Sequence, residues 1–111
     1  MKKQSVLFVC LGNICRSPAA EAIFLDLINK KGLNESFIVD SAGTGSWHIG
    51  KKADTRMRIA SRKRGVEISS RARQINPNDF EKFHYIVAMV DSNYENIIDM
   101  KSRKSLSDFA L

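Results

Sequence analysis

Cys10 and Arg16 are the residues of this chain whose types and spacing best suit a chemical reaction. Five residues separate them, and Ser17 directly follows the arginine. A cysteine thiolate is a strong nucleophile, and an arginine guanidinium can hold two oxygens of one phosphoryl group. The segment therefore predicts a loop that binds a tetrahedral oxyanion and carries its own nucleophile.

The residues inside this loop fit that task. Gly12 permits a close turn of the backbone, and Asn13 tolerates left-handed geometry. The backbone N–H groups can surround an oxyanion, and a helix N-terminus directly after the loop adds positive potential. Together with Arg16, that potential is expected to favour the thiolate form of Cys10. The predicted phosphate-binding residues are Leu11, Gly12, Asn13, Ile14, Cys15 and Arg16.

A strand and a helix are expected to position the loop. Ser5–Leu11 is a continuous apolar run, typical of a strand that is buried on both faces of a parallel sheet. Ser17 can cap the following helix, Pro18 fits its first position, and Glu21 favours its first turn. Gly32 ends the helix. The loop would thus join the end of a buried strand to the start of a helix.

The rest of the chain continues in strands and helices. Short apolar runs predict strands, helical spacing predicts helices, and a polar loop is expected at residues 41–50. This order predicts an α/β fold of three layers, in which helices flank a central parallel sheet of four strands, within one domain at 1–111. The expected strands are 37–39, 85–89 and 104–111, and the expected helices are 54–64, a turn after Asn76-Pro77, and 92–100.

Composition narrows the function classes. The chain has 111 residues, an apolar share of 43% and a net charge of +6, so one domain with an ordinary core and an anionic partner is expected. No apolar run reaches the roughly 18 residues that span a bilayer. Two cysteines five positions apart cannot staple a secreted scaffold. The expected compartment is the cytoplasm, without a membrane partner.

Two other interpretations of the cysteines are weaker. Cys10 could be a buried core thiol, but the arginine at the sixth position and the helix start beyond it favour the nucleophile. The C-x4-C spacing is unusual for zinc, and only His48 and His84 remain as further ligands. Neither a metal nor an organic cofactor is expected.

The segment VLFVCLGNICRSPAAEAIF, Val6–Phe24, resembles the N-terminal signature of the low-molecular-weight protein tyrosine phosphatases. At position 14 this chain has Ile and resembles the tyrosine-specific members of the family. The members that act on phosphoarginine carry Thr at this position. Arsenate reductases need later cysteines, and none follows Cys15. The resemblance continues through Asp40–Thr44, Trp47–Gly50, Ala53-Asp54, Arg56, Ser69–Gln74, Asp79-Phe80, Ala88-Met89 and Asn93.

The resemblance implies a role for each matching residue. Cys10 would form a phosphocysteine, and Arg16 would bind and stabilise the transferring phosphoryl group. Ser17 would donate to the Cys10 thiolate and assist it as a leaving group. Asn13 would hold the loop in shape, with Ser41 as one partner. Phosphotyrosine proteins or peptides would be the substrates, with inorganic phosphate and vanadate as inhibitors.

Two further residues have an implied role and a purely structural alternative. Cys15 would form a reversible disulfide with Cys10 under peroxide, or it packs below the loop. Trp47 would form one aromatic wall of a deep pocket, which phosphotyrosine can reach across and phosphoserine cannot. Its alternative is packing alone.

The sequence departs from the family in several places. Family members are longer, and their Asp-Pro loop supplies a general acid, whereas these residues contain no Asp-Pro pair. We therefore expect the domain to be incomplete at its C-terminus, with the acid beyond residue 111 and self-association through an uncovered sheet face. General acid–base help is worth about 10²–10⁴-fold, so a weak phosphatase or a phosphate-binding module is the alternative.

Val90 replaces the family's usual Asp, and Ser70 stands where animal members have His. The spare carboxylates are expected at the surface: Asp40, Asp91, Asp99 and Asp108.

A basic stretch at residues 51–73 holds nine Lys or Arg against two acids. A solvated helix face explains such a stretch most simply, and attraction of acidic phosphopeptides is the main functional alternative. Nucleic-acid binding is disfavoured because no aromatic residues alternate with these charges.

Overall fold

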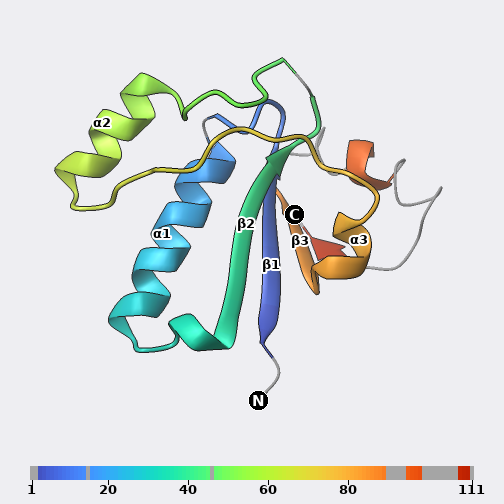
Figure 1. Cartoon of the computed structure of the whole chain (residues 1–111), viewed down its shortest axis with the longest axis horizontal. Coiled ribbons are helices and arrows are strands. Elements are labelled where there is room, and N and C mark those ends of the chain that lie inside the picture. The colour runs from blue at the N-terminus through green and yellow to red at the C-terminus, as the bar shows by residue number, and fades with distance from the viewer. Residues whose placement is uncertain (1–2, 15, 46, 90–94, 99–107, 111) are drawn as a thin grey trace.

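The sheet is built around the first strand. A computed structural model of the chain describes residues 3–14, 16–45, 47–89, 95–98 and 108–110. β1 (Gln4–Cys10) pairs in parallel with β2 (Phe37–Gly43) on one side and with β3 (Tyr85–Ala88) on the other. β4 (Asp108–Ala110) adds to β3, so the order is β2-β1-β3-β4. The four-stranded parallel sheet predicted from the sequence is confirmed (Figure 1).

Helices lie on both sides of this sheet. α1 (Arg16–Lys30) connects β1 to β2 through a short 3-10 turn, η1 (Asn34–Ser36). α2 (Thr55–Lys63) lies beyond α1, while α3 (Asp79–Lys82) lies on the opposite side of the sheet (Figure 1). Residues 95–98 are also helical. The three-layer arrangement follows from strands that are apolar on both faces and need cover on each.

Alternation along β1 divides the core. Leu7 and Val9 belong to a cluster that contains Phe80 and Phe83 from the α3 region, and all four are at most 1% exposed. The side chain between them, Phe8, packs instead against Phe24 of α1, with ring centroids 5.9 Å apart. Successive strand residues point to opposite faces, which is why the run appears continuously apolar in the sequence. A second, smaller cluster joins α1 to the α2 region: Ala19, Ala53 and Ile68, with Ala22 and Met57.

β2 is longer than the sequence predicted. The strand was expected at residues 37–39, with a loop from Ser41, but it continues to Gly43. Its register with β1 runs without interruption from Gln4↔Phe37 to Cys10↔Gly43. Backbone pairing with a central strand thus overrides the small and polar side chains of residues 40–43. Ser41 is therefore fixed in the sheet, and its position is set by the ladder.

Candidate active site

The loop after β1 lies at the carboxyl edge of the sheet, where the chain's connections diverge. β2 flanks β1 on one side and β3 on the other, so the helices that follow leave in opposite directions. In open α/β sheets such a switch point is the usual place for a ligand. The predicted loop residues therefore lie at this switch point of the sheet.

Cys10 is the last residue of β1 and is 8% exposed. Its sulfur lies 2.8 Å from the Ser17 hydroxyl and accepts a hydrogen bond from the main-chain N–H of Asn13 at 3.1 Å. Asn13 Nδ2 donates to Ser17 Oγ at 2.8 Å. Because Ser17 Oγ already accepts from Asn13, its own proton is available for the sulfur. The Asn13 N–H and the Ser17 hydroxyl thus both lie within hydrogen-bond distance of the Cys10 sulfur.

Ser17 differs from its predicted local role. It was expected to cap α1, but it lies inside the helix and is fully buried. Its hydroxyl contacts Cys10 and Asn13, and lies 3.5 Å from the carbonyl of Ala42. The Ser17 side chain therefore bonds within the loop and to β2, and does not cap the helix.

Asn13 is the most constrained residue of the loop. Its φ of 58° lies in the left-handed region, which non-glycine residues rarely adopt, and it is 2% exposed. Besides Ser17, its amide donates to Ser41 Oγ at 3.0 Å. Its Oδ1 accepts from the main-chain N–H of Arg73 at 2.9 Å. Asn13 was expected to hold the loop with Ser41 as a partner, and the structure brings these two side chains together.

The carbonyl groups of the loop are occupied by neighbouring segments. The N–H groups of Thr44 and Gly45 donate to the carbonyls of Cys10 and Leu11, at 2.9 and 2.8 Å, and the N–H of Asp54 donates to Ile14 at 2.6 Å. Three N–H groups of the loop make no hydrogen bond to another described residue: those of Leu11, Gly12 and Ile14. Three carbonyls of the loop are thus bonded to neighbouring segments, while these N–H groups have no partner among the described residues and would suit an anion.

Two glycines allow the segments around the loop to approach it closely. A Cβ at Gly43 would lie 2.7 Å from the Leu11 carbonyl oxygen and 3.1 Å from the Asn13 nitrogen. A Cβ at Gly12 would lie 2.8 Å from Cδ2 of His48. The first neighbour is backbone and cannot move aside, so Gly43 is required by the loop's packing against β2.

The remaining predicted residues lie around the loop. Arg16 is the exposed first residue of α1. Trp47 is 67% exposed, and its ring covers Gly45, which is itself bonded to Leu11. Cys15 lies outside the described residues, so its predicted pairing with Cys10 stays a prediction.

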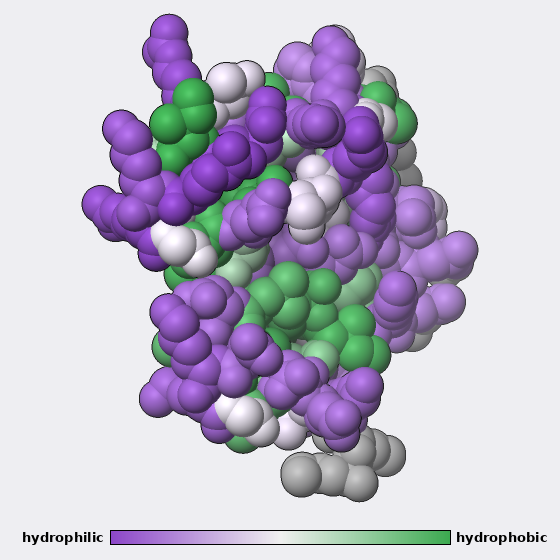
Figure 2. Space-filling view, turned by 60° about the vertical axis from the view of Figure 1, so that its left-hand side comes forward, coloured by the Kyte–Doolittle hydropathy of each residue, from purple (hydrophilic) through white to green (hydrophobic). Residues whose placement is uncertain are grey.

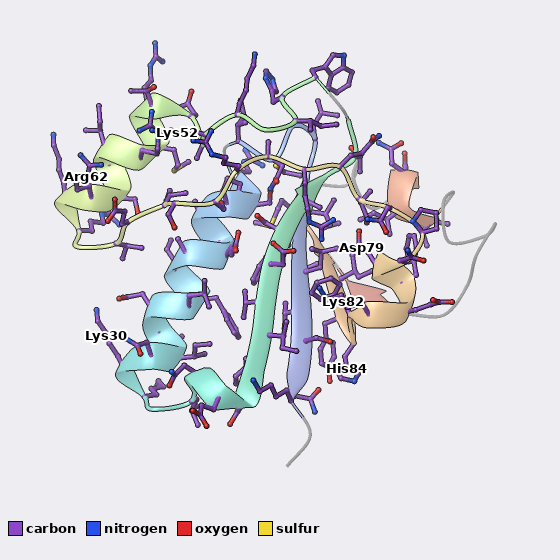
Figure 3. All side chains as sticks on the ribbon, viewed as in Figure 1. Lys30, Lys52, Arg62, Asp79, Lys82 and His84 are labelled. Atoms are coloured by element: carbon purple, nitrogen blue, oxygen red, sulfur yellow. The ribbon has the colours of Figure 1, made fainter. Side chains whose placement is uncertain are left out.

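His84, one of the residues considered for zinc, lies far from Cys10. His84 Nδ1 lies 3.0 Å from the Ser5 hydroxyl, five residues before Cys10 along β1, which is about 16 Å in a strand. Figure 3 shows His84 near the end of the sheet that is remote from the loop. Within the part of the chain that the structure describes, no group of three or more His, Cys, Asp or Glu could hold a metal ion.

Comparison with known protein families identifies the family of this chain. The model described as low molecular weight phosphotyrosine protein phosphatase matches residues 5–109. The chain belongs to this family. A relative from Synechocystis, named as a low molecular weight protein-tyrosine-phosphatase, is 52% identical over 93 residues, which are 84% of this chain and 59% of that protein. The chain thus spans less than two thirds of that relative's length.

Solved structures of the low molecular weight phosphatase family show the same fold. The crystal structure of YfkJ from Bacillus subtilis has a TM-score of 0.92 and 44% identity, covering 98% of this chain and 69% of that one. A Drosophila arginine phosphatase also has a TM-score of 0.92, with 37% identity, and covers 100% of this chain and 70% of that one. Because both superpose equally well, the fold alone does not distinguish the two substrate types.

In this member of the family, two supporting residues escaped sequence analysis. Glu21 Oε1 accepts from the Ser41 hydroxyl at 2.6 Å. Burial raises the pKa of Glu21; Asp40 adds to the rise, while hydrogen bonds from Ser41 and Ser70 and the charge of Arg73 oppose it. Helical spacing indicated only that Glu21 favours the first turn. Its contact with β2 depends on how α1 packs, which no local pattern reveals.

Arg73 is the second supporting residue. Its guanidinium donates to both carboxylate oxygens of Asp79 at 3.1 Å and to Asp40 at 3.1 Å. Although burial opposes it, the hydrogen bond to Asp79 and the charge of Asp40 keep the pKa of Arg73 above its ordinary value. Asp40 was expected to be a surface carboxylate; its side chain is 36% exposed, but it also pairs with Arg73 and accepts from the N–H of Ser41 at 2.8 Å. Asp91 and Asp99 lie outside the described residues, as does the side chain of Asp108.

Proposed function

We propose that the chain is a protein-tyrosine phosphatase that works through a cysteinyl-phosphate intermediate. The observation that carries this proposal is the position of Cys10. Its sulfur receives two hydrogen bonds at the base of a loop whose N–H groups at Leu11, Gly12 and Ile14 are unpaired within the described chain. A thiolate so placed lies below the anion that such a loop would bind.

The reaction proceeds in two displacements. The Cys10 thiolate attacks phosphorus, the bond between phosphorus and the tyrosine oxygen breaks, and the phenolate leaves and takes up a proton. Water then attacks the phosphorus of the phosphocysteine, the S–P bond breaks, and inorganic phosphate and the thiolate result. Arg16 and the loop N–H groups hold the equatorial oxygens in both steps. Ser17 donates to the sulfur, which makes the thiolate a better leaving group in the second step.

The supporting residues keep the loop in its binding shape. Asn13 and Ser41 fix the left-handed turn, and Trp47 provides one wall for an aromatic ring. Phosphotyrosine is favoured over phosphoarginine because residue 14 is Ile and not Thr. Inorganic phosphate and vanadate would occupy the same loop and inhibit. Cys15 would protect Cys10 by forming a disulfide after oxidation.

The proposed setting is a single phosphatase domain in the cytoplasm. No helix of the described residues is long and apolar enough to cross a membrane. Phosphotyrosine proteins are the proposed substrates, and association between copies of the chain stays a prediction that sedimentation would test.

A phosphate- or phosphotyrosine-binding module is the second candidate. The observation that favours it is the absence of an Asp-Pro pair from these 111 residues, since that pair carries the family's general acid. A complete loop without an acid would still bind phosphate. It would cleave substrates with poor leaving groups slowly, because those leaving groups need a proton.

Hydrolysis of p-nitrophenyl phosphate by the 111 residues distinguishes the two candidates, because this leaving group scarcely needs a proton. The phosphatase proposal predicts turnover that Cys10→Ser abolishes and vanadate inhibits. Ser17→Ala should slow the second displacement, so that phosphoenzyme accumulates and can be trapped. Phosphate binding by a folded chain without any turnover would establish the binding module instead.

A further inference from the structure

Four cationic side chains line a hollow beside α2 that the proposed reaction does not use. Its volume is about 190 Å³. Figure 2 shows this side of the molecule, with long hydrophilic side chains gathered over its upper part, where α2 lies. The lining residues are Lys52, Arg58, Arg62, Glu67, Ile68, Ser69 and Arg71.

The backbone brings these cations together from two segments. Lys52 and Arg71 are antiparallel partners in an isolated β-bridge. Arg58 and Arg62 stand one helical turn apart on α2, which is about 6 Å along its axis. The hollow is therefore formed where the helix passes the bridge, and Figure 3 shows Lys52 and Arg62 on the same side of the molecule.

Two of the guanidinium groups are already held in place. Arg58 Nε donates to the Ala53 carbonyl at 2.9 Å, and one terminal nitrogen reaches Thr55 Oγ1 at 3.3 Å. Arg71 donates to the Gly50 carbonyl at 3.0 Å. Each keeps further N–H groups for a ligand, since a guanidinium has five donors. Less side-chain entropy is then lost when an anion binds.

The positive charge of the hollow is not neutralised from within. None of its four cations forms a salt bridge among the described residues. The ion pairs found there lie elsewhere and join Arg73 to Asp40 and Asp79, and Lys30 to Asp26. Glu67 is the single carboxylate in the lining. Like charges that share a hollow repel one another, so an anion bound there would relieve that repulsion.

We propose that this hollow is a second anion site, which binds a carboxylate or phosphate side chain of the polypeptide substrate while its phosphotyrosine occupies the Cys10 loop. The inference rests on the proposed phosphatase function. The position of the hollow supports it, because the N–H of Asp54, between the bridge and α2, is bonded to Ile14 of the loop. The same segment thus borders both anion sites.

The lining favours a polypeptide over a nucleic acid. No aromatic side chain lines the hollow, whereas proteins that bind single strands stack bases on aromatic rings. The hollow, at about 190 Å³, has the size of a site for a single side-chain group. A nucleic-acid site, in contrast, follows the nucleic-acid backbone along a groove.

The test compares two phosphotyrosine peptides that differ only in carrying Glu or Gln at the flanking positions. The measured quantity is the ratio of their kcat/KM values, which cancels any effect of a variant on the chemistry itself. Lys52→Gln with Arg62→Gln removes two cations from the hollow; neither side chain makes a hydrogen bond to another residue that the structure describes. Arg56→Gln with Lys63→Gln is the matched control, since it removes one Lys and one Arg that do not line it.

The chain should prefer the Glu peptide by about 2- to 10-fold, and raised salt should weaken this preference. The hollow variant should bring the ratio close to one, while the control keeps most of it. An equal fall in both double variants would show diffuse charge attraction and overturn the site, as would no change in either.

A binding measurement separates this proposal from the proposed reaction. If the chain hydrolyses nothing, the anisotropy of a labelled, unphosphorylated Glu peptide still reports the hollow, and its binding should weaken in the hollow variant only. Retained binding in that variant would reject the site. A single-stranded oligonucleotide of equal charge that displaces the peptide at lower concentration would overturn the choice of a polypeptide.

Discussion

The main-chain N–H of Arg73 donates a hydrogen bond to Oδ1 of Asn13 at 2.9 Å, although sixty residues separate the two in the sequence. The same arginine clamps Asp40 and Asp79 with its guanidinium. The left-handed residue of the loop after β1 is therefore held by a segment that is itself held by two carboxylates. Stability and loop geometry are coupled at this point.

Asn13→Gly and Asn13→Ala should both lower turnover, by at least about 10-fold, because each loses the bonds to Ser17, Ser41 and Arg73. Gly adopts the φ of 58° freely, whereas Ala carries a further cost of about 1 kcal/mol. The free energy of unfolding should thus fall more for Ala than for Gly. Denaturant melts and p-nitrophenyl phosphate kinetics measure both. Full activity in either variant would show that Asn13 does not maintain the loop.

Gly43→Ala should reduce activity because its Cβ would meet the backbone of Leu11 and Asn13. The loop must shift, and overpacking of this kind costs about 1–3 kcal/mol. Gly65→Ala is the control: its φ is +81° but nothing lies within 4 Å of the added atom. It should lose stability through backbone strain alone and keep its kcat. Equal kcat values in the two variants would contradict this role for Gly43.

Arg73→Leu should destabilise the chain by about 3 kcal/mol, since it leaves the carboxylate of Asp79, which is 5% exposed, without its partner. The double variant Arg73→Leu/Asp79→Leu should recover part of that loss because no buried charge remains unpaired. Lys30→Leu, which breaks the exposed pair with Asp26, should change stability by less than about 1 kcal/mol. Chemical denaturation of the four proteins checks the order. Similar losses for Arg73→Leu and Lys30→Leu would mean that the clamp is no stronger than a surface pair.

Glu21 should make stability depend on pH in a defined direction. Burial raises its pKa in the folded chain above the ordinary value of 4.5, so the folded state binds this proton more tightly than the unfolded state. Its contribution is therefore fully present below pH 4.5 and is lost as the pH rises through the raised pKa. The unfolding free energy of the parent chain minus that of Glu21→Gln should fall across this window. A difference that rises with pH there would reverse the assignment.

Trp47→Ala should raise KM for phosphotyrosine substrates and leave the melting temperature almost unchanged. The side chain is 67% exposed, so it contributes little to the core, and its place over Gly45 suits contact with a bound ring. Trp47→Phe should restore most of the affinity because it keeps an aromatic face. A fall in melting temperature of more than a few degrees, with KM unchanged, would assign Trp47 to packing.

The sequence predicted the fold and the loop because both rest on local patterns. The apolar run of β1, the cysteine at its end and the helix start beyond Arg16 are contiguous, so the anion loop could be interpreted without knowing the tertiary structure. The parallel sheet followed from the order of the elements. The ends of the elements do not follow from local patterns. The strand expected at residues 37–39 continues through Ser41 to Gly43 because its ladder with β1 continues there.

The support of the loop could not be predicted in the same way. Glu21 was interpreted only as a first-turn acid and Asp40 as a surface residue, and both lie in hydrogen-bond networks that join distant segments. Such contacts depend on how α1 packs and on where residues 72–75 pass the end of β2. No spacing in the sequence encodes that geometry.

The central position of β1 has a consequence for synthesis. Cys10 is made early, but β3, which completes the cover of its strand, ends at Ala88. At translation rates of about 5–20 residues per second, roughly 4 to 16 s pass between the synthesis of these two points. Through that interval the nascent chain carries Cys10 without the complete β3 beside its strand. The thiol is therefore most open to oxidants and to wrong partners on the ribosome, before the molecule has its shape.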